Sequence, residues 1–406
     1  MLARLAAEEV RETAALTARQ LAALGVGTGD RVAVSLRPSL EFAALLHAMP
    51  LLGSILVPIN TRDPQQAVDA DILVDAPLTG PEADVPPRAE PSADDVWVVL
   101  HTSGTTAAPK PVELSYGNFR ASAAAAQANL PLRPDDRWLC VLPLFHVGGL
   151  SILTRTALYG ASAIVHERFA AEAVRGALES GEATIVSLVA TMLRRLREAG
   201  LERAPALRAA LVGGGPVPRD LLEWGAEVGL PLLQTYGMTE TCSQIATAPA
   251  GSSAARPLPG VDVRIGDGGE ILVRGPMVSR GSLGDDGWLH TGDRGRLDRG
   301  GFLHVDGRIK DTIVTGGENV AAAEVEEALL AHPAVADAAV VGRPDPEWGE
   351  AVTAFVVVDG AGAGDEELVA WCRSRLAGYK VPRAIVRVDE LPRTASGKLL
   401  KGRLSG

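Results

Sequence analysis

The sequence has little cysteine and a deficit of basic charge. Its three cysteines, Cys140, Cys242 and Cys372, are far apart and follow no metal-binding spacing. They favour a reducing compartment over a disulfide framework. Lys and Arg together number 39, against 50 Asp and Glu, which gives a net charge of −11. Because no basic stripe offsets this balance, the composition argues against nucleic acid and against an anionic membrane surface as partners.

Long uncharged apolar runs are also missing. Glu8, Glu9 and Glu12 lie where a secretory signal peptide needs an uninterrupted apolar core. No stretch approaches the roughly 20 uncharged residues that a helix needs to cross a bilayer. The sequence therefore predicts a soluble cytoplasmic protein without a membrane partner. It leaves the oligomeric state open, with a homodimer as one alternative.

What is present is enough apolar character for a large core, at 47% of 406 residues, a length typical of two or three folding units. From residue 30 to 235, short β-rich runs alternate with helical ones, which indicates βαβ units and a largely parallel sheet. The proline-rich acidic segment 76–95 is expected to be a surface loop. The predicted strands are 31–35, 96–101, 137–142, 162–167, 183–189 and the second half of 206–214, and the predicted helices are 116–130, 170–180 and 191–200.

The pattern changes twice towards the C-terminus. After residue 255, short strands separated by Gly-Asp turns predict a small β-rich subdomain. From Asp311 onward, two helical and several strand-like segments predict a compact α+β module. We therefore expect an α/β fold with a large N-terminal domain, residues 1–307, of parallel-rich sheets with helices plus the β-rich subdomain. A hinge at 308–312 would join it to a small mobile α+β C-terminal domain, residues 313–406.

The stretch HTSGTTAAPK, residues 101–110, has the chemistry of a phosphate-binding loop. Glycine lets the backbone approach a ligand, hydroxyl and N–H groups donate hydrogen bonds, and lysine supplies positive charge. The stretch does not match the Walker pattern. A Ser/Thr-rich turn without a ligand explains these residue types equally well. The candidate phosphate-binding residues are Thr102, Ser103, Gly104, Thr105, Thr106 and Lys110.

Five further motifs occur with this stretch in a particular order. They are GGGP (213–216), QTYGMTET (234–241), HTGD (290–293), DGRIKD (306–311) and PRTASGK (392–398). In this order and at this spacing, the chain resembles the adenylate-forming superfamily of acyl-CoA synthetases, luciferases and peptide-synthetase adenylation domains. The resemblance extends from about residue 20 to 404. Taken singly, each motif has an ordinary structural explanation, such as a turn, a core aromatic or a solvated charge.

The resemblance implies a nucleotide site on the large domain. The 102–110 stretch would hold the β- and γ-phosphates of ATP, and the glycines at 213, 214 and 215 would leave room for the adenine. Tyr236, followed by Gly237, would stack on that base. Thr239 and Glu240 would face the α-phosphate, with Glu240 as a Mg²⁺ ligand. The glycines concerned are Gly213, Gly214 and Gly215.

The resemblance also assigns residues near and within the small domain. Asp293 would accept hydrogen bonds from both ribose hydroxyls, with Arg308 nearby. Lys398 would bridge the substrate carboxylate and the α-phosphate, neutralising charge where two anions meet. The small domain would then rotate about Lys310 so that coenzyme A can enter. After rotation Gly316 and Gly317 would line the thiol tunnel, although a plain glycine turn before a helix explains them as well.

The amino-acid sequences of two stretches indicate which acid is the substrate. LPLFHVGGLSIL (142–153) and TETCSQ (239–244) most resemble the o-succinylbenzoate–CoA ligases of menaquinone biosynthesis. His146 would form a gate between acyl pocket and thiol tunnel, or else be an ordinary core histidine. The second carboxylate of that acid, if buried, needs hydrogen bonds or a cation. Candidates to hold it are Ser187, Ser243 and Gln244.

Two alternatives remain at this point. One is an acyl-CoA synthetase for another aryl or short-chain acid. The other is a weakened nucleotide-binding homologue, because Ala107 and Pro111 stand where the superfamily usually has glycine in the phosphate loop. Alanine at a position of positive φ costs roughly 1 kcal/mol, so ATP affinity is the property in question.

Overall fold

The computed structural model describes residues 3–60, 68–84, 91–102, 110–358, 363–393 and 399–404. The chain forms two compact units. The first comprises residues 1–215, 224–262 and 273–289, and the second comprises 216–223, 263–272 and 290–406. The strand pair that precedes Arg308 thus belongs to the second compact unit. The expected hinge at 308–312 concerns movement and stays a prediction.

The larger sheet of the first unit has eight strands in the order β1-β8-β7-β9-β10-β11-β12-β13. The strands from β8 to β11 run parallel to one another, and β1, β12 and β13 add antiparallel edges. Parallel strands buried on both faces are expected from their continuous apolar runs. Their bounds are β1 Ala3–Ala6, β7 Arg137–Cys140, β8 Ser162–Val165, β9 Ile185–Val189, β10 Ala209–Gly213, β11 Leu232–Met238, β12 Ser243–Thr247 and β13 Arg256–Pro257.

A second sheet of the first unit has five strands in the order β4-β2-β3-β5-β6. All neighbours are parallel except β5 and β6, which form an antiparallel pair. That antiparallel pair brackets the candidate phosphate-binding stretch. The bounds are β2 Arg31–Val34, β3 Ile55–Pro58, β4 Ile72–Val74, β5 Val96–Thr102 and β6 Lys110–Ser115.

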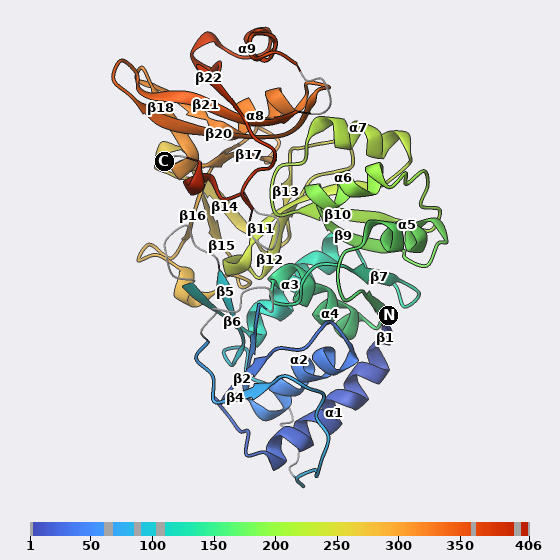
Figure 1. Cartoon of the computed structure of the whole chain (residues 1–406). Coiled ribbons are helices and arrows are strands. Elements are labelled where there is room, and N and C mark those ends of the chain that lie inside the picture. The colour runs from blue at the N-terminus through green and yellow to red at the C-terminus, as the bar shows by residue number, and fades with distance from the viewer. Residues whose placement is uncertain are drawn as a thin grey trace. The chain divides into compact units, whose positions relative to one another are not determined.

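Helices cover these sheets and join them through one core. Figure 1 shows α1 and α2 side by side, in the same part of the view as β2 and β4. Buried residues of α1 to α4 and of both sheets form a single hydrophobic cluster, and the indole Nε1 of Trp97 donates to the carbonyl of Leu46 at 2.7 Å. The helices are α1 Ala7–Ala23, α2 Leu40–Leu52, α3 Tyr116–Asn129, α4 Val147–Tyr159, α5 Ala171–Glu179, α6 Ala190–Glu198 and α7 Arg219–Glu227.

The second unit is built around two further sheets. One has the order β14-β15-β16-β17, and the other has the order β19-β18-β21-β20 with β22 beside β21. α8 and α9 share a separate core with the latter sheet (Figure 1). The bounds are β14 Asp262–Ile265, β15 Glu270–Arg274, β16 Leu289–Leu297, β17 Leu303–Arg308, β18 Thr312–Thr315, β19 Glu318–Ala321, β20 Val335–Asp345, β21 Gly349–Val358, β22 Ala384–Arg387, α8 Ala322–Leu330 and α9 Asp365–Arg373.

The expected α/β class is confirmed, with parallel-rich sheets, a β-rich part and a C-terminal α+β part. Helices α1, α2, α4 and α7 were not predicted. The reason is clearest for α2, because eight of its 13 residues are buried and it shows no apolar stripe against a polar face. Such a segment cannot be distinguished from a buried strand by periodicity alone.

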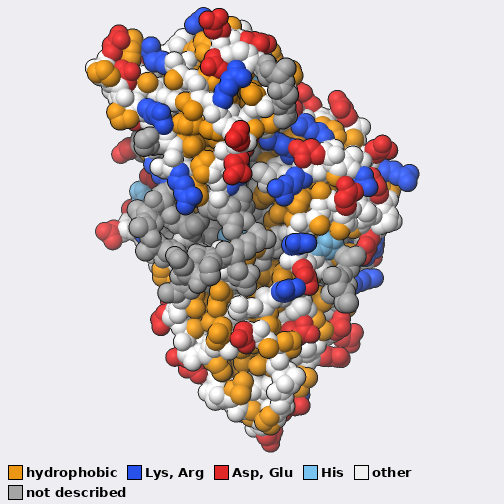
Figure 2. Space-filling model, viewed as in Figure 1, with side chains coloured by type: hydrophobic (Ala, Val, Ile, Leu, Met, Phe, Trp, Pro, Cys, Tyr) orange, Lys and Arg blue, Asp and Glu red, His pale blue; other side chains and the backbone are white. Residues whose placement is uncertain are grey.

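The surface carries charges of both signs. On the face shown in Figure 2, basic and acidic side chains are interspersed, with hydrophobic side chains between them. In the part of the chain that the structure describes, no helix is both long enough and apolar enough to cross a membrane.

Candidate functional site

The centre of the candidate site is a tight turn between β11 and β12, residues 237–243, hereafter the 237–243 turn. It contains one turn of 3₁₀ helix, Thr239–Thr241, followed by Cys242 at φ 51° and Ser243 at φ 95°. Positive φ costs a non-glycine residue of order 1–3 kcal/mol, and such strain persists only where surrounding contacts hold it. At Gly237 a Cβ would lie 2.1 Å from the Ser243 carbonyl oxygen, so only glycine fits there.

The first of these contacts comes from inside the turn. Thr241 is completely buried, and its hydroxyl oxygen accepts a hydrogen bond from the Met238 N–H at 2.9 Å. The same oxygen lies 2.8 Å from the Ser243 carbonyl and 3.0 Å from the Met238 carbonyl, to either of which it can donate. One side chain thus closes the turn on itself.

Two further contacts tie the turn to other segments of the first unit. The Ser279 N–H donates to the carbonyl of Glu240 at 2.8 Å, and the Ser279 hydroxyl donates to the carbonyl of Glu113 in β6 at 2.8 Å. From α3, the Ser122 hydroxyl donates to the carbonyl of Cys242 at 2.6 Å. The carbonyl of Glu240 and that of Cys242, two residues later, are therefore each held by a buried donor.

Behind Ser122 lies a buried cation. Arg155 of α4 is only 3% exposed, and its Nη2 donates to the Ser122 hydroxyl oxygen at 3.1 Å. Burial lowers the pKa of the Arg155 guanidinium to about 10, so it stays protonated at neutral pH. Within the described residues no Asp or Glu forms an ion pair with it. A charge in this position carries a desolvation cost that an anionic ligand could offset.

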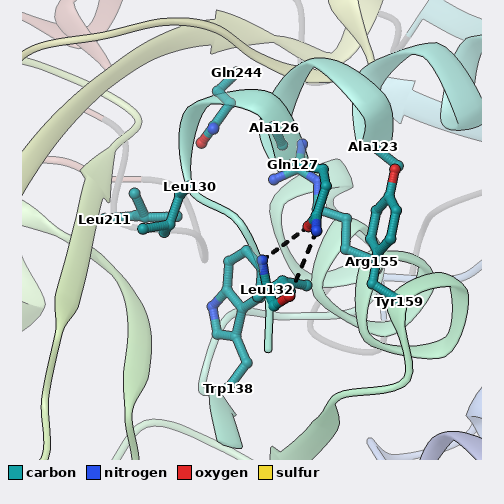
Figure 3. A pocket seen from close by; sticks show the side chains of 10 residues that line it. All are labelled: Ala123, Ala126, Gln127, Leu130, Leu132, Trp138, Arg155, Tyr159, Leu211 and Gln244. Atoms are coloured by element: carbon teal, nitrogen blue, oxygen red, sulfur yellow. Dashed lines mark hydrogen bonds between the residues drawn. The ribbon is translucent and has the colours of Figure 1, made fainter. Parts of the chain in front are cut away.

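Arg155 lines a cavity between α3, α4 and the large sheet (Figure 3). The cavity is narrow, with room for about one water molecule, so a bound ligand would have to move its side-chain walls. Burial also raises the pKa of the Tyr159 hydroxyl. The lining residues are Ala123, Ala126, Gln127, Leu130, Leu132, Trp138, Arg155, Tyr159, Leu211 and Gln244.

The three predicted acyl-pocket residues lie around this cavity in different ways. Gln244 is 7% exposed and forms part of the wall. Ser187 does not line the cavity itself but contacts a residue that does, because its hydroxyl accepts a hydrogen bond from the indole Nε1 of Trp138 at 3.1 Å. Ser243 belongs to the 237–243 turn and adjoins Gln244. His146 immediately precedes α4, with its ring centroid 4.6 Å from that of Phe145.

The predicted nucleotide residues of the first unit lie where parallel strands end. Gly213 ends β10, and Tyr236 lies in the neighbouring strand β11. The carboxyl edge of a parallel sheet is the usual place for a ligand in such folds. Thr102 and Lys110 pair across β5 and β6, and the Thr102 hydroxyl donates to the Lys110 carbonyl at 3.2 Å. Ser103, Gly104, Thr105 and Thr106 lie outside the described residues.

In the second unit, Asp293 and Arg308 are neighbours on β16 and β17. Arg308 Nε lies 2.9 Å from Asp293 Oδ1, and Asp293 is 6% exposed. The Thr291 hydroxyl accepts from the Asp293 N–H at 3.0 Å, and the Thr291 carbonyl accepts from Arg308 Nη1 at 3.0 Å. Lys310 follows in a short 3₁₀ segment, where burial lowers the pKa of its ammonium.

The candidate thiol tunnel also has a defined structure. Gly316 and Gly317 connect β18 to β19, both at positive φ, and the Gly316 N–H donates to the Trp348 carbonyl at 2.8 Å. A Cβ at Gly316 would lie 2.8 Å from the Trp348 ring. The Arg383 guanidinium lies 3.8 Å from the centroid of the same ring. The glycine turn therefore abuts an aromatic ring with a cation over its face.

Comparisons with known proteins decide the family. Residues 3–75 and 66–283 match the family described as AMP-binding enzyme, and residues 324–398 match the AMP-binding enzyme C-terminal domain. The chain belongs to the AMP-binding enzyme family. Its match is nearly full-length, because the 2-succinylbenzoate–CoA ligase of Bacillus cereus is 40% identical over 98% of this chain and 92% of that protein.

Solved structures of AMP-binding enzymes agree with this assignment. The o-succinylbenzoate CoA synthetase (MenE) from Bacillus subtilis, in complex with the acyl-adenylate intermediate OSB-AMP, has a TM-score of 0.89 and 36% identity, covering 98% of this chain and 92% of that one. The same synthetase with ATP and magnesium ion has a TM-score of 0.87 and 36% identity, covering 97% and 93%. ATP-bound MatB from Rhodopseudomonas palustris has a TM-score of 0.88 and 28% identity, covering 97% and 92%.

For this AMP-binding enzyme, the sequence pointed to none of three residues that lie in or beside the candidate site, Arg155, Trp348 and Arg383. Arg155 stands alone in an apolar helical segment, and nothing in the sequence distinguishes it from a solvated charge. Trp348 and Arg383 are 35 positions apart and meet only through the pairing of β21 with β22. The only local signal was an aromatic residue next to a glycine in the turn before β21.

Lys398 lies outside the described residues, but the chain on either side of it is anchored. Arg393 and Leu399 form an isolated β-bridge. Arg393 Nη2 lies 2.7 Å from Asp337 Oδ2, and Lys401 Nζ lies 2.7 Å from Glu326 Oε1. In this AMP-binding enzyme the chain is therefore tied to β20 before Lys398 and to α8 after it.

Proposed function

We propose that the protein is a 2-succinylbenzoate–CoA ligase of menaquinone biosynthesis. It uses ATP to convert the aliphatic carboxylate of its acid into an acyl adenylate with release of pyrophosphate, and then transfers the acyl group to the thiol of coenzyme A with release of AMP. The observation that carries the choice of acid is Arg155, a buried cation on a cavity wall in a chain 40% identical to relatives of that name.

The second carboxylate of the acid would pair with Arg155. Only one N–H of its guanidinium has a hydrogen-bond partner among the described residues, which leaves donors for a carboxylate. Gln244 adds an amide on the same wall, and Tyr159 adds a hydroxyl (Figure 3). A charged hydrogen bond in a desolvated site contributes about 1.5–3 kcal/mol, enough to favour a diacid over a monoacid.

The nucleotide would bind along the carboxyl edge of β10 and β11. Among the described residues no cluster of three or more His, Cys, Asp or Glu could hold a metal ion. A lone Glu240 nevertheless fits Mg²⁺, which commonly takes one or two protein carboxylates, with phosphate oxygens and water as its other ligands. Mg²⁺ held there would neutralise phosphate charge. Tyr236 would stack on the adenine and Asp293 would accept from the ribose hydroxyls.

In the first step a carboxylate oxygen of the acid attacks the α-phosphorus, and pyrophosphate leaves. Both reactants are anions, so the ammonium of Lys398 would lower the barrier by neutralising charge in the transition state. In the second step the thiol sulfur attacks the acyl carbon and AMP leaves. For that step the Gly316–Gly317 turn, with Trp348 and Arg383 beside it, would receive coenzyme A, since an aromatic ring and a cation suit its adenine and phosphates.

All three substrates are water-soluble small molecules, namely a carboxylic acid, ATP and coenzyme A. We therefore place the enzyme in the cytoplasm, in keeping with the reduced cysteines that the composition favours. The homodimer stays a prediction, to be checked by light scattering.

A panel of acids tests the proposal directly. Purified protein with ATP, Mg²⁺ and coenzyme A should release AMP with 2-succinylbenzoate at a kcat/KM at least about tenfold above that with 3-benzoylpropionate, which lacks the ring carboxylate. Equal rates with benzoate or short-chain acids would instead identify another aryl or short-chain acyl-CoA synthetase. No AMP release and no nucleotide binding would identify a weakened homologue.

The hinge assignment leads to a second test, the variant Lys310→Pro. Proline fixes φ and restricts the preceding residue, so rotation about this position should be impaired. Overall turnover should fall by about tenfold or more, while adenylation, measured by pyrophosphate exchange, stays near the wild-type rate. Lys310→Ala is the matched control, because it removes the same ammonium and leaves the backbone free. Normal turnover in Lys310→Pro would count against a hinge here.

A further inference from the structure

Ser122 joins the cavity wall to the 237–243 turn. Its hydroxyl oxygen accepts from Arg155 Nη2 at 3.1 Å, and its hydroxyl proton is donated to the carbonyl of Cys242 at 2.6 Å. Ser122 is 2% exposed, Arg155 3%, and Cys242 is completely buried. Two direct hydrogen bonds therefore connect the side chain facing the acid cavity with the backbone two residues after Glu240.

This use of a helical serine is not the local default. Serine and threonine in a helix commonly donate to a carbonyl three or four residues earlier in the same helix. Ser151 and Thr156 of α4 do so, to the carbonyls of Val147 and Ile152. Ser122 instead donates to a carbonyl 120 positions away, at one of the two consecutive non-glycine residues with positive φ. Its hydroxyl is committed to holding the strained turn.

The state of Arg155 determines how firmly Ser122 is held. Among the described residues, the guanidinium has this single hydrogen bond. A carboxylate would fix the guanidinium, and thereby the orientation of the hydroxyl that donates to Cys242. Hydrogen bonds in a buried chain reinforce one another, and a ligand that orders a shared element lowers the ordering cost for the next ligand.

We propose that Ser122 is a positioning residue that couples binding of the acid's second carboxylate at Arg155 to binding of Mg²⁺ and ATP at Glu240. This inference rests on the proposed function, because it needs a diacid at Arg155 and a metal–nucleotide complex at Glu240. Coupling of this kind is reciprocal, so the acid should tighten the nucleotide by the same factor as the nucleotide tightens the acid.

Calorimetry measures the factor by which the acid changes the affinity for the nucleotide. The nucleotide used is α,β-methylene-ATP with Mg²⁺, because this analogue cannot form an adenylate. In the wild type, saturating 2-succinylbenzoate should lower the Kd of the nucleotide by about 5- to 20-fold. In Ser122→Ala the factor should fall below about twofold, with each ligand alone bound within about threefold of its wild-type affinity. Such a loss of coupling with intact single-ligand binding is not expected from a merely structural serine.

Two further variants test whether the loss of coupling is specific to the Ser122 hydroxyl. Ser54→Ala removes another buried hydroxyl, which donates to the Met49 sulfur at 3.2 Å away from the cavity, and should keep the wild-type factor. Ser122→Cys preserves the shape of the side chain, but its thiol is a weak hydrogen-bond donor, so this variant should also lose the coupling. It tests the role of Ser122 if Ser122→Ala does not fold.

Failure of the proposed role of Ser122 can be distinguished from failure of the proposed function. If the wild type turns over 2-succinylbenzoate but shows no coupling, or if Ser122→Ala and Ser122→Cys keep the full factor, the role of Ser122 is wrong and the proposed function stands. If the wild type neither binds the acid nor releases AMP with it, the proposed function fails and this inference fails with it.

Discussion

Lys398→Ala is expected to slow acyl-adenylate formation by about 10²–10³-fold, the loss typical of removing one preorganised donor from a developing charge. Transfer of the acyl group from a preformed adenylate to coenzyme A should be largely unchanged, because that step needs Lys398 away from the reacting atoms. Pyrophosphate exchange measures the first step, and rapid-quench analysis with synthetic adenylate measures the second.

The structure suggests a control for this experiment. Arg387→Ala removes a cation of β22 whose ion pair with Asp365 is partly exposed, and it should leave both steps unchanged. The bridge and ion pairs that anchor the chain on either side of Lys398 do not depend on its side chain, so the variant should fold normally. An equal loss in both steps would mean that Lys398 is not dedicated to adenylation.

Arg155→Met is expected to raise KM for 2-succinylbenzoate by about 10- to 150-fold, which corresponds to losing a charged hydrogen bond in a desolvated site. With 3-benzoylpropionate, which has no second carboxylate, the kcat/KM of Arg155→Met should be equal to or higher than that of the wild type. The preference for the diacid should therefore collapse. Steady-state kinetics with both acids measure this ratio.

The fold should tolerate this substitution. Replacing a buried charge that lacks a carboxylate partner by an apolar side chain of similar length is commonly neutral or stabilising, so Tm should not fall. Arg155→Lys provides a second variant, which keeps the charge but loses the planar guanidinium that can donate two parallel hydrogen bonds. Its KM for 2-succinylbenzoate should lie between those of Arg155→Met and the wild type. An unchanged KM for the diacid in Arg155→Met would remove Arg155 from the acid site.

Parts of the candidate nucleotide site could be anticipated, because several of its residues lie on strands that are neighbours in the sheet. The motif GGGP begins at the end of β10 and the motif QTYGMTET lies in and just after β11, and in a parallel sheet the ends of neighbouring strands lie at one edge. Asp293 and Arg308 are 15 positions apart on two strands joined by one turn, so hairpin pairing alone makes them neighbours. Such features follow from local patterns and short connections.

The sequence by itself determined the class of fold, the order of the motifs and the residue types at the candidate nucleotide site, because periodicity and turn chemistry are local properties. Only the tertiary structure showed that Arg155 is buried, that Ser122 links it to Cys242, and that Cys242 and Ser243 adopt positive φ. These facts depend on the packing of α3 and α4 against β12, segments up to 120 positions apart. Burial and desolvation arise from such distant contacts, and no local pattern encodes them.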